Sequence, residues 1–270
     1  GVINLGDDDR LAVSGKFRLT TNGSGAATVV NATGLNFMSA NVGGNFAATA
    51  TNGAITCDVL TGCAFDIGGT TDVYSKTDHN IILDNAANDF VGDVRFRGGA
   101  VVIKDANDIE FGGGDSTAKN TLADLNGNEY ALKVYAGDRI TDDNALPSDL
   151  KVTGGNAWFG TNFGNEPAGS GDDAASRSRI VLDSAGNVFS GTTTLRGGIG
   201  YTVSSSSSVV LTAMNLPGNL KVTTTGGTVT DTGVLIVEGT TEITATGLDV
   251  TLDGDGVNHN NFIGPVQIAA

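Results

Sequence analysis

Residues 81–92 read Ile81-Ile-Leu-Asp-Asn-Ala-Ala-Asn-Asp-Phe-Val-Gly92, and residues 180–191 repeat the phrase as Ile180-Val-Leu-Asp-Ser-Ala-Gly-Asn-Val-Phe-Ser-Gly191. A looser copy follows at residues 250–264, and a weaker one opens the chain near residue 2. Sequence that repeats at this scale comes from a repeated structural unit. Residues that recur in every copy are expected to serve the architecture, so residues that break the repeat are the better candidates for function.

Each full copy divides into roughly four coils of about 20 residues, a repeat length typical of strand-based solenoids. Within a coil, apolar and polar residues alternate, as in Phe65-Asp-Ile67 and Leu220-Lys-Val222. A period of two predicts half-buried β-strands. A single coil cannot bury its inward face, but coils stacked about 4.8 Å apart pair their backbones and share a core.

The sequence therefore predicts an all-β fold, a right-handed parallel β-helix (β-solenoid) of about 13 coils of roughly 20 residues. Residues 1–270 are expected to form a single domain, with internal copies that start near residues 2, 81, 180 and 250. Strand-like sequence reaches both ends of the chain. We therefore expect the ends to be covered by head-to-tail stacking of chains or by flanking repeats of a longer chain.

The composition limits the partners and the compartment. The chain has 40 glycines, only 4 prolines and a formal net charge of −15. Such a surface repels nucleic acid and anionic lipid. No apolar run is long enough to cross a membrane, so membrane insertion is not expected. The chain begins with Gly1 rather than Met, which favours a processed chain or a segment of a longer one, and we expect an extracellular or cell-surface location.

Two kinds of polar residue recur with the repeat and are interpreted as a structural turn ladder. The asparagines precede a repeated Phe, where Asn tolerates left-handed backbone and can stack with its equivalents, and the aspartates follow the Leu of each copy, where they are expected to cap the same turn. The asparagines are Asn88, Asn187 and Asn260, and the aspartates are Asp84, Asp183 and Asp253.

The two cysteines, Cys57 and Cys63, lie six residues apart around the turn Leu60-Thr-Gly62. They are either a local disulfide or two reduced core cysteines, and the spacing does not separate the two. Neither cysteine suggests a zinc site, because such a site needs more ligands.

Two insertions interrupt the second copy, at residues 113–130 and 161–178. Insertions in a solenoid form surface loops and often carry the binding face. The single Trp, Trp158, aligns with core positions of the other copies, so it is expected in the core rather than as a platform for a sugar. The residues expected to contact a ligand or partner are Tyr130, Phe159, Phe163, Asp172 and Asp173.

The acidic clusters match no known calcium loop and are interpreted as solvated turns, with weak Ca²⁺ binding as the minor alternative and no metal site assigned. The aspartates recur with the repeat, which favours a role in turns over catalysis. We therefore assign no catalytic residue, no enzyme activity and no cofactor.

With the repeat laid out, the chain resembles the haemagglutinin-type repeats of large bacterial exoproteins, the filamentous haemagglutinin-like adhesins. The resemblance rests on Asp84-Asn-Ala-Ala-Asn-Asp-Phe90 with the strand to Phe96, and on the coil from Leu220 to Gly227. It implies a secreted right-handed β-helix that serves as a stalk or adhesive fibre. The expected function is thus a non-enzymatic extracellular structural or adhesive rod, with a host or matrix glycan as a further partner.

Two other functions stay open on the sequence alone. A polysaccharide-acting β-helix enzyme, a lyase or a glycosidase, needs convergent carboxylates in a groove. A surface- or ice-binding solenoid needs regular Thr files, for which Thr223-Thr-Thr225 and Thr192-Thr-Thr194 are the candidates.

Overall fold

The structure is a computed structural model that describes residues 1–6, 11–57, 62–123, 129–142, 149–161 and 179–270. Within those residues every regular element is a β-strand. Two long parallel sheets and one short one contain almost all of the strands, and an antiparallel pair stands apart from them.

The first long sheet has 15 strands. They are β1 (Ile3–Leu5), β3 (Ala27–Asn31), β5 (Phe46–Ala50), β8 (Thr71–Ser75), β11 (Val94–Gly98), β13 (Ile109–Phe111), β14 (Ser116–Ala118), β18 (Ile140–Asp142), β19 (Leu150–Val152), β21 (Arg179–Leu182), β22 (Val188–Phe189), β24 (Gly200–Ser205), β27 (Asn219–Thr224), β30 (Thr241–Ala245) and β33 (Val266–Ala269).

The second long sheet has 13 strands. They are β2 (Lys16–Thr20), β4 (Leu35–Val42), β6 (Ile55–Cys57), β7 (Phe65–Ile67), β9 (Ile81–Leu83), β10 (Asp89–Phe90), β12 (Val101–Asp105), β17 (Leu132–Ala136), β20 (Ala157–Thr161), β23 (Thr192–Arg196), β25 (Val209–Leu211), β28 (Val229–Asp231) and β31 (Val250–Thr251). The short parallel sheet contains β26 (Met214–Leu216), β29 (Leu235–Val237) and β32 (Asn261–Phe262), and the antiparallel pair is β15 (Leu122–Ala123) with β16 (Glu129–Tyr130).

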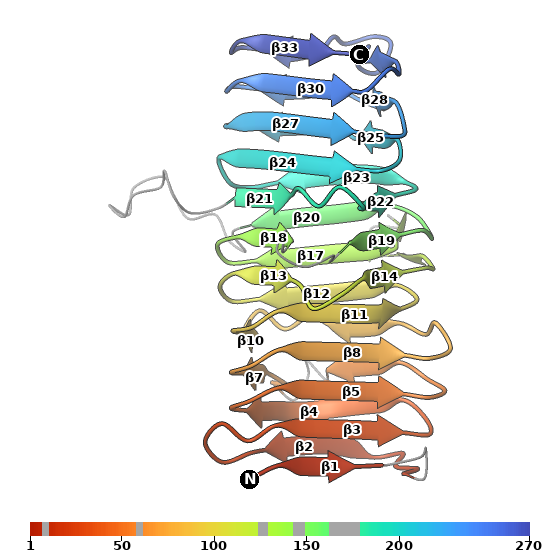
Figure 1. The fold of residues 1–270 in the computed structure, drawn as a ribbon, viewed down its shortest axis with the longest axis vertical. Coiled ribbons are helices and arrows are strands. Elements are labelled where there is room, and N and C mark those ends of the chain that lie inside the picture. The colour runs from red at the N-terminus through yellow and green to blue at the C-terminus, as the bar shows by residue number, and fades with distance from the viewer. Residues whose placement is uncertain (7–10, 58–61, 124–128, 143–148, 162–178) are drawn as a thin grey trace.

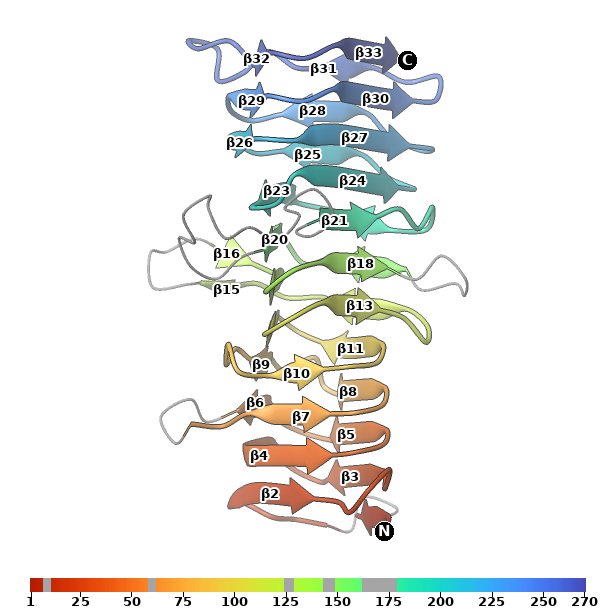
Figure 2. The same cartoon turned by 90° about the vertical axis from the view of Figure 1, so that its left-hand side faces the viewer.

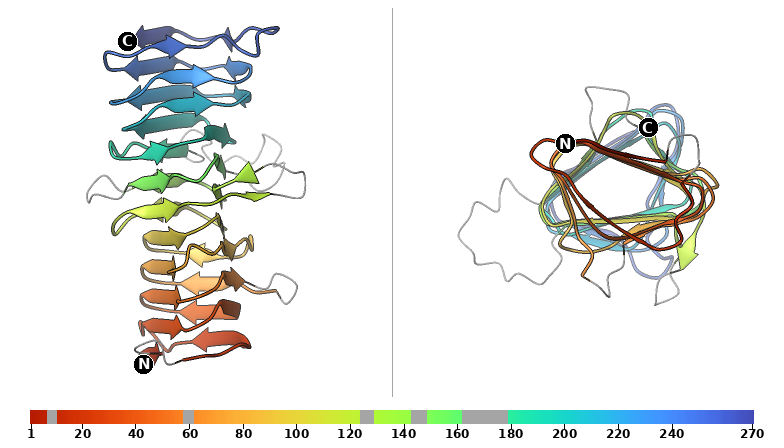
Figure 3. Two further views of the ribbon diagram at one scale, coloured as in Figure 1. Left: turned by 90° about the vertical axis from the view of Figure 1, so that its right-hand side faces the viewer. Right: turned by 90° about the horizontal axis from the view of Figure 1, so that it is seen from below.

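The coils wind in a right-handed sense. Seen from one side, the near strands β3, β5 and β8 run to the right, β4 returns to the left behind them, and the chain climbs from the N-terminus to the C-terminus (Figure 1). Seen along the axis, the coils superpose on one closed outline (Figure 3). The predicted parallel β-solenoid is therefore confirmed.

The stack has about 10 turns rather than the 13 expected. The strand pairing shows why. Ala27 pairs with Phe46 one coil later, and Phe46 pairs with Thr71 in the next coil, so successive coils differ in length. The step from Ile140 to Ile180 is longer still, because it contains the segment 162–178. A constant coil of roughly 20 residues, typical of regular strand-based repeats, thus overestimates the number of coils.

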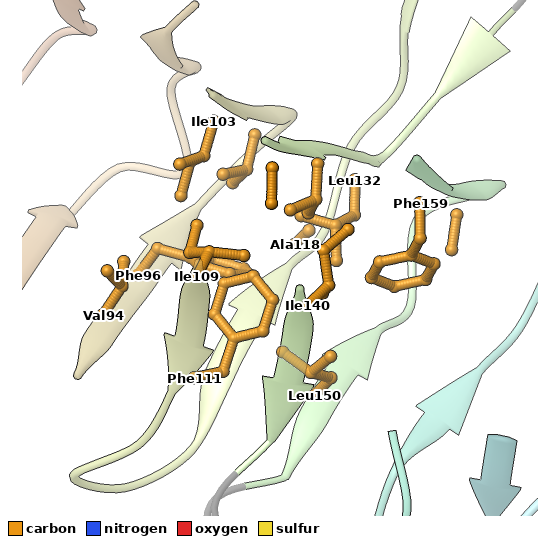
Figure 4. Close-up of a cluster of buried hydrophobic side chains, with 14 of the residues drawn as sticks. Val94, Phe96, Ile103, Ile109, Phe111, Ala118, Leu132, Ile140, Leu150 and Phe159 are labelled. Carbon is orange, nitrogen blue, oxygen red and sulfur yellow. The ribbon is translucent and has the colours of Figure 1, made fainter. Parts of the chain in front are cut away.

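The core follows from the period-two pattern. Strands such as β5, β8 and β17 alternate buried and half-buried residues, so one side of each strand faces the interior of the coil. Like residues then stack along the axis: the Phe37 ring centroid lies 5.8 Å from that of Phe17 and 5.3 Å from that of Phe65. Figure 4 shows the same inward packing in the middle of the stack, where Phe96 and Phe111 meet edge to face.

Repeated glycines mark corners where one coil rests directly on the next. A Cβ atom added to Gly92 would lie 2.8 Å from the carbonyl carbon of Gly69, and one added to Gly264 would lie 2.2 Å from the carbonyl oxygen of Gly239. No real Cβ contact is that short. The recurrence of glycine at these corners therefore comes from the close approach of two backbones.

The first predicted insertion, at residues 113–130, is only partly a loop. Residues 116–118 form β14, which pairs in parallel with β11 and β19 inside the first long sheet. The hairpin of β15 and β16 is the part that projects from the side of the stack (Figure 2). The predicted insertion was too long because the short strand β14 has no large apolar residue by which the sequence could identify it as a strand.

Candidate functional site

The predicted roles of Trp158 and Phe159 are exchanged in the structure. Phe159 is fully buried and points into the core (Figure 4), whereas Trp158 is half-buried on the outer face of β20. The turn between β19 and β20 spans residues 153–156, one residue more than the equivalent turn between β7 and β8. One extra residue reverses which side chains face inward, so the expectation that Trp158 lies in the core and Phe159 outside was wrong.

Trp158 belongs to a group of outward-facing aromatic residues. Its ring centroid lies 4.3 Å from that of Tyr135 on the neighbouring strand β17, with the planes tilted by 41°. The Lys133 ammonium lies 4.7 Å from the ring centroid of Tyr130, 5.6 Å from that of Tyr135 and 5.7 Å from that of Trp158. We call these four residues, Tyr130, Lys133, Tyr135 and Trp158, the aromatic shelf.

Two local features hold the aromatic shelf together. The indole covers Gly160, where an added Cβ atom would lie 2.1 Å from the indole ring. Because Gly160 pairs with Tyr135, the missing side chain lets the indole lean across its own strand toward that ring. The hairpin brings Tyr130 in from the side and is fastened by the Asn156 side chain, which donates to the Glu129 carbonyl oxygen at 2.9 Å.

The parallel register places basic residues at both ends of the aromatic shelf. Lys104, Tyr135, Gly160 and Arg196 follow one another on adjacent strands β12, β17, β20 and β23. The Lys104 ammonium lies 5.3 Å from the Tyr135 ring centroid. Arg196 is exposed at the other end of the same file. Three strand spacings of about 4.8 Å put the two ends about 14 Å apart.

A cavity of about 260 Å³ lies beside Tyr135 and Lys133. Leu122 and Ala123 of the hairpin line it, together with Ile82 of β9 and Val102 of β12. Asp84 and Lys104 also line it. The shelf thus presents ring faces, cations and a shallow hollow on one face of the rod, an arrangement suited to a ligand with both apolar and anionic parts.

The recurring asparagines hold the corners of the stack. The side-chain oxygens of Asn88, Asn187 and Asn260 each accept a hydrogen bond from the backbone N–H that begins a strand one coil earlier. The donors are the amides of Phe65, Leu150 and Leu235, with N–O distances of 3.0, 2.7 and 2.7 Å. These three bonds join the asparagine side chains to the backbone of the preceding coil.

The backbone amides of Asp183 and Asp253 take part in these corners. The amide of Asp183 donates to Asp142 Oδ1 at 2.8 Å, and the amide of Asp253 donates to Asp231 Oδ1 at 3.1 Å. Asp84 instead lies half-buried at the edge of the cavity beside the shelf. The capping side chains, Asp142 and Asp231, lie one coil earlier, where a comparison of the copies alone does not find them.

Asp142 and Asp231 each also receive an Asn side chain. Asn187 Nδ2 donates to Asp142 Oδ2 at 2.7 Å, and Asn260 Nδ2 donates to Asp231 Oδ2 at 2.6 Å. Burial raises the pKa of Asp142 to about 6, even though the hydrogen bonds from Asn187 and the two backbone amides lower it. The carboxylate oxygens at these two corners are therefore engaged by the chain itself.

Asp105 is a second buried carboxyl group, at the end of β12. It accepts hydrogen bonds from the backbone amides of Phe90 and Asn107, both at 2.7 Å. Burial raises its pKa to about 7, and the nearby charges of Asp89 and Asp108 act in the same direction.

Cys57 and Cys63 form a disulfide, and both side chains are buried. Of the two alternatives that the spacing left open, the structure therefore has the disulfide. It closes the loop between β6 and the segment before β7, whose inner residues 58–61 lie outside the described part of the chain.

The remaining predicted contact residues are not placed. Phe163, Asp172 and Asp173 lie outside the described residues, as does nearly all of the second insertion, 161–178. In the described segments no group of three or more His, Cys, Asp or Glu side chains is arranged to hold a metal ion. Asp255, from one of the acidic clusters, bonds instead to the amides of Val257 and Asn258, which lower its pKa to about 2.

The Thr files suggested by the sequence are short. Ser204, Thr223 and Thr244 stand in register on the outer side of the first long sheet, and the next position on β33 is Ala269. Thr224, from the same run as Thr223, is fully buried.

Among the residues that the structure describes, no helix is long and apolar enough to cross a membrane.

A family model described as repeats of unknown function (DUF5649) matches residues 24–97 and 198–269, more than half of the chain. Comparison with curated proteins and with solved structures gave no match. The first matched stretch runs from β3 to β11 and the second from β24 to β33, and the single long strand β4 of the first has two short strands, β25 and β26, as its counterpart in the second. The aromatic shelf, Lys104 and Arg196 all lie between the two matches. By the extent of the match, the chain belongs to the family of repeats of unknown function (DUF5649).

Proposed function

We propose that the chain is a non-enzymatic extracellular rod with a structural and adhesive role, as a segment of a large bacterial exoprotein of the haemagglutinin-repeat kind or as a subunit of a head-to-tail filament. The observation that carries the adhesive part is the aromatic shelf. Tyr135 and Trp158 stack on the outer face of a solenoid whose other large aromatic residues mostly face the core. Stacked rings on a rigid sheet offer the C–H face of a sugar a prepared surface.

The structural role is supported by the continuity of the stack. The first long sheet is connected from β1 to β33 by parallel pairing, and the second from β2 to β31. Pulling along the axis would load many backbone hydrogen bonds at once, which suits a stalk. The disulfide between Cys57 and Cys63 supports an oxidising, extracellular location, because such bonds persist outside the cytosol.

An adhesion assay tests the proposal. Beads coated with the chain are passed over surfaces that carry matrix polysaccharides, and the retained fraction is measured. We expect retention to fall to the level of uncoated beads when Tyr130, Tyr135 and Trp158 are all replaced by Ser. The control carries Lys221→Ser, Thr223→Ala and Glu242→Ser on the outer side of the other long sheet and should be retained like the wild type. Equal retention of both variants would contradict the proposal.

A further inference from the structure

Basic residues gather on the face that carries the aromatic shelf. The whole chain has 15 Lys and Arg against 30 Asp and Glu, yet the outer side of β12, β17, β20 and β23 presents Lys104, Lys133 and Arg196 within four adjacent strands. Among the residues that the structure describes, Asp84 lines the cavity beside them and Glu129 lies on the hairpin. The described part of this face is thus locally basic on an acidic protein.

The contacts of Lys104 and Arg196 differ from those of two cations elsewhere on the rod. Lys221 is paired with Glu242 at 2.9 Å, and Arg139 is paired with Asp108 at 2.9 Å. Lys104 instead lies against the ring of Tyr135, and Arg196 is exposed. A cation held over a ring keeps its charge available to an anionic group that approaches from outside.

We infer that this face binds an acidic polysaccharide, whose sugar rings stack on Tyr135 and Trp158 and whose carboxylates meet Lys104 and Arg196. The inference rests on the proposed function, because it names the ligand class of the same adhesive surface. Lys104 and Arg196 lie at the two ends of a file about 14 Å long, set by three strand spacings of about 4.8 Å. A polymer of uronic acids carries one carboxylate on each sugar ring. Its carboxylates can therefore reach the two separated cations while its sugar rings stack on the aromatic rings between them.

A nucleic acid also combines rings with negative charge, but the observations favour the glycan. A nucleic acid strand carries one charge per about 3.4 Å, which is denser than the cations of this face. The net charge of −15 on the rod repels such a chain more strongly than it repels a polymer with widely spaced carboxylates. Single-stranded DNA is therefore the competing probe in the test.

Trp158 provides the readout, because it is the only Trp in the chain and lies in the shelf. The full chain is titrated with oligogalacturonides, with the same oligomers after methyl esterification, and with oligo(dT). We expect a saturable change in Trp fluorescence with the free acid, roughly tenfold weaker binding of the ester, and weaker binding of the acid as salt is added. Calorimetry with the same probes detects binding that leaves the indole spectrum unchanged.

Charge variants locate the effect. Lys104→Gln and Arg196→Gln are each expected to weaken binding of the free acid several-fold and to leave binding of the ester unchanged. Asp84→Asn, which removes the carboxylate beside Lys104, is expected to strengthen binding of the acid. Lys221→Gln removes an equal charge from the opposite long sheet and serves as the matched control.

The outcomes separate the two proposals. Equal affinity for acid and ester, or no effect of the charge variants, would overturn the acidic ligand class and keep the shelf as a glycan contact. Tighter binding of oligo(dT) than of the acid would also overturn it, in favour of a nucleic acid. If neither fluorescence nor calorimetry detects any glycan, and beads are not retained, the proposed adhesive function fails as well.

Discussion

The rings of Trp158 and Tyr135 lie 4.3 Å apart on the outer face of two paired strands, and the indole reaches Tyr135 by leaning over Gly160. Gly160→Ala should therefore push the indole away from Tyr135 toward solvent. Trp fluorescence is expected to shift to the red, while the midpoint of thermal unfolding changes little. Gly15→Ala is the control, because an added methyl group there meets no atom within 4 Å. An unchanged spectrum in Gly160→Ala would show that the indole lies elsewhere.

The exchanged roles of Trp158 and Phe159 predict a large difference in stability. Phe159→Ala leaves a cavity in the core and should lower the free energy of unfolding by about 3 to 5 kcal/mol. Trp158→Ala removes an outward side chain, so its effect is expected to stay near or below about 1 kcal/mol. Urea unfolding of the two variants measures both values. The opposite order would restore the sequence-based alignment that puts Trp158 in the core.

The corner asparagines predict a second stability difference. Asn187→Ala leaves the buried Leu150 amide without a partner and removes one of the hydrogen bonds to Asp142, and a buried unsatisfied group costs about 1 to 3 kcal/mol. Asn260→Ala breaks equivalent bonds to Leu235 and Asp231, but at a more exposed site, so a smaller loss is expected. Thermal unfolding of the two variants at one pH compares them. Equal losses of stability in the two variants would mean that the burial of the asparagine does not determine how much its hydrogen bonds stabilise the fold.

Asp105 predicts how stability depends on pH. An unfolded aspartate titrates near about pH 3.9, whereas burial raises the pKa of Asp105 to about 7. Between these values the folded chain keeps a proton that the unfolded chain loses. This contribution to stability is therefore complete below about pH 4 and is lost as the pH rises to about 7, by at most about 1.4 kcal/mol per pH unit.

Asp105→Asn removes this titration, so the unfolding free energy should fall less steeply from pH 4 to pH 7 in the variant than in the wild type. The comparison of slopes cancels the titration of Asp142 and of the surface carboxylates, which both proteins share. It is also independent of any constant loss from the altered bonds to Phe90 and Asn107. Parallel slopes would contradict a raised pKa at Asp105.

The repeat predicts the architecture well because it reports what every coil must satisfy. Alternating residues such as Phe65 and Ile67 fix the inward face, and close approach of backbones fixes glycine at positions such as Gly92. The coil count was too high because turns differ in length, and no residue pattern marks a turn that gains one residue. That same extra residue, between β19 and β20, reversed the expectation for Trp158 and Phe159.

The candidate site was only partly accessible from the sequence. Tyr130 was expected to face outward and does so, on the hairpin. Lys104, Lys133 and Arg196 lie far apart in the chain and come together only through the register of β12, β17, β20 and β23. All of them lie between residues 97 and 198, the stretch that holds the two insertions and separates the two family matches.

The most direct test of the central claim is hydroxyl-radical footprinting of the full chain, with and without oligogalacturonides, read by mass spectrometry. The claim is that the aromatic shelf is the contact surface of the rod. It predicts that oxidation of Trp158, Tyr135 and Tyr130 falls when the oligomer is bound. Tyr74, which lies on the other long sheet under Arg97, should be oxidised equally in both samples. Protection of Tyr74 in place of Trp158 and Tyr135, or uniform oxidation in the presence of bound oligomer, would contradict the account.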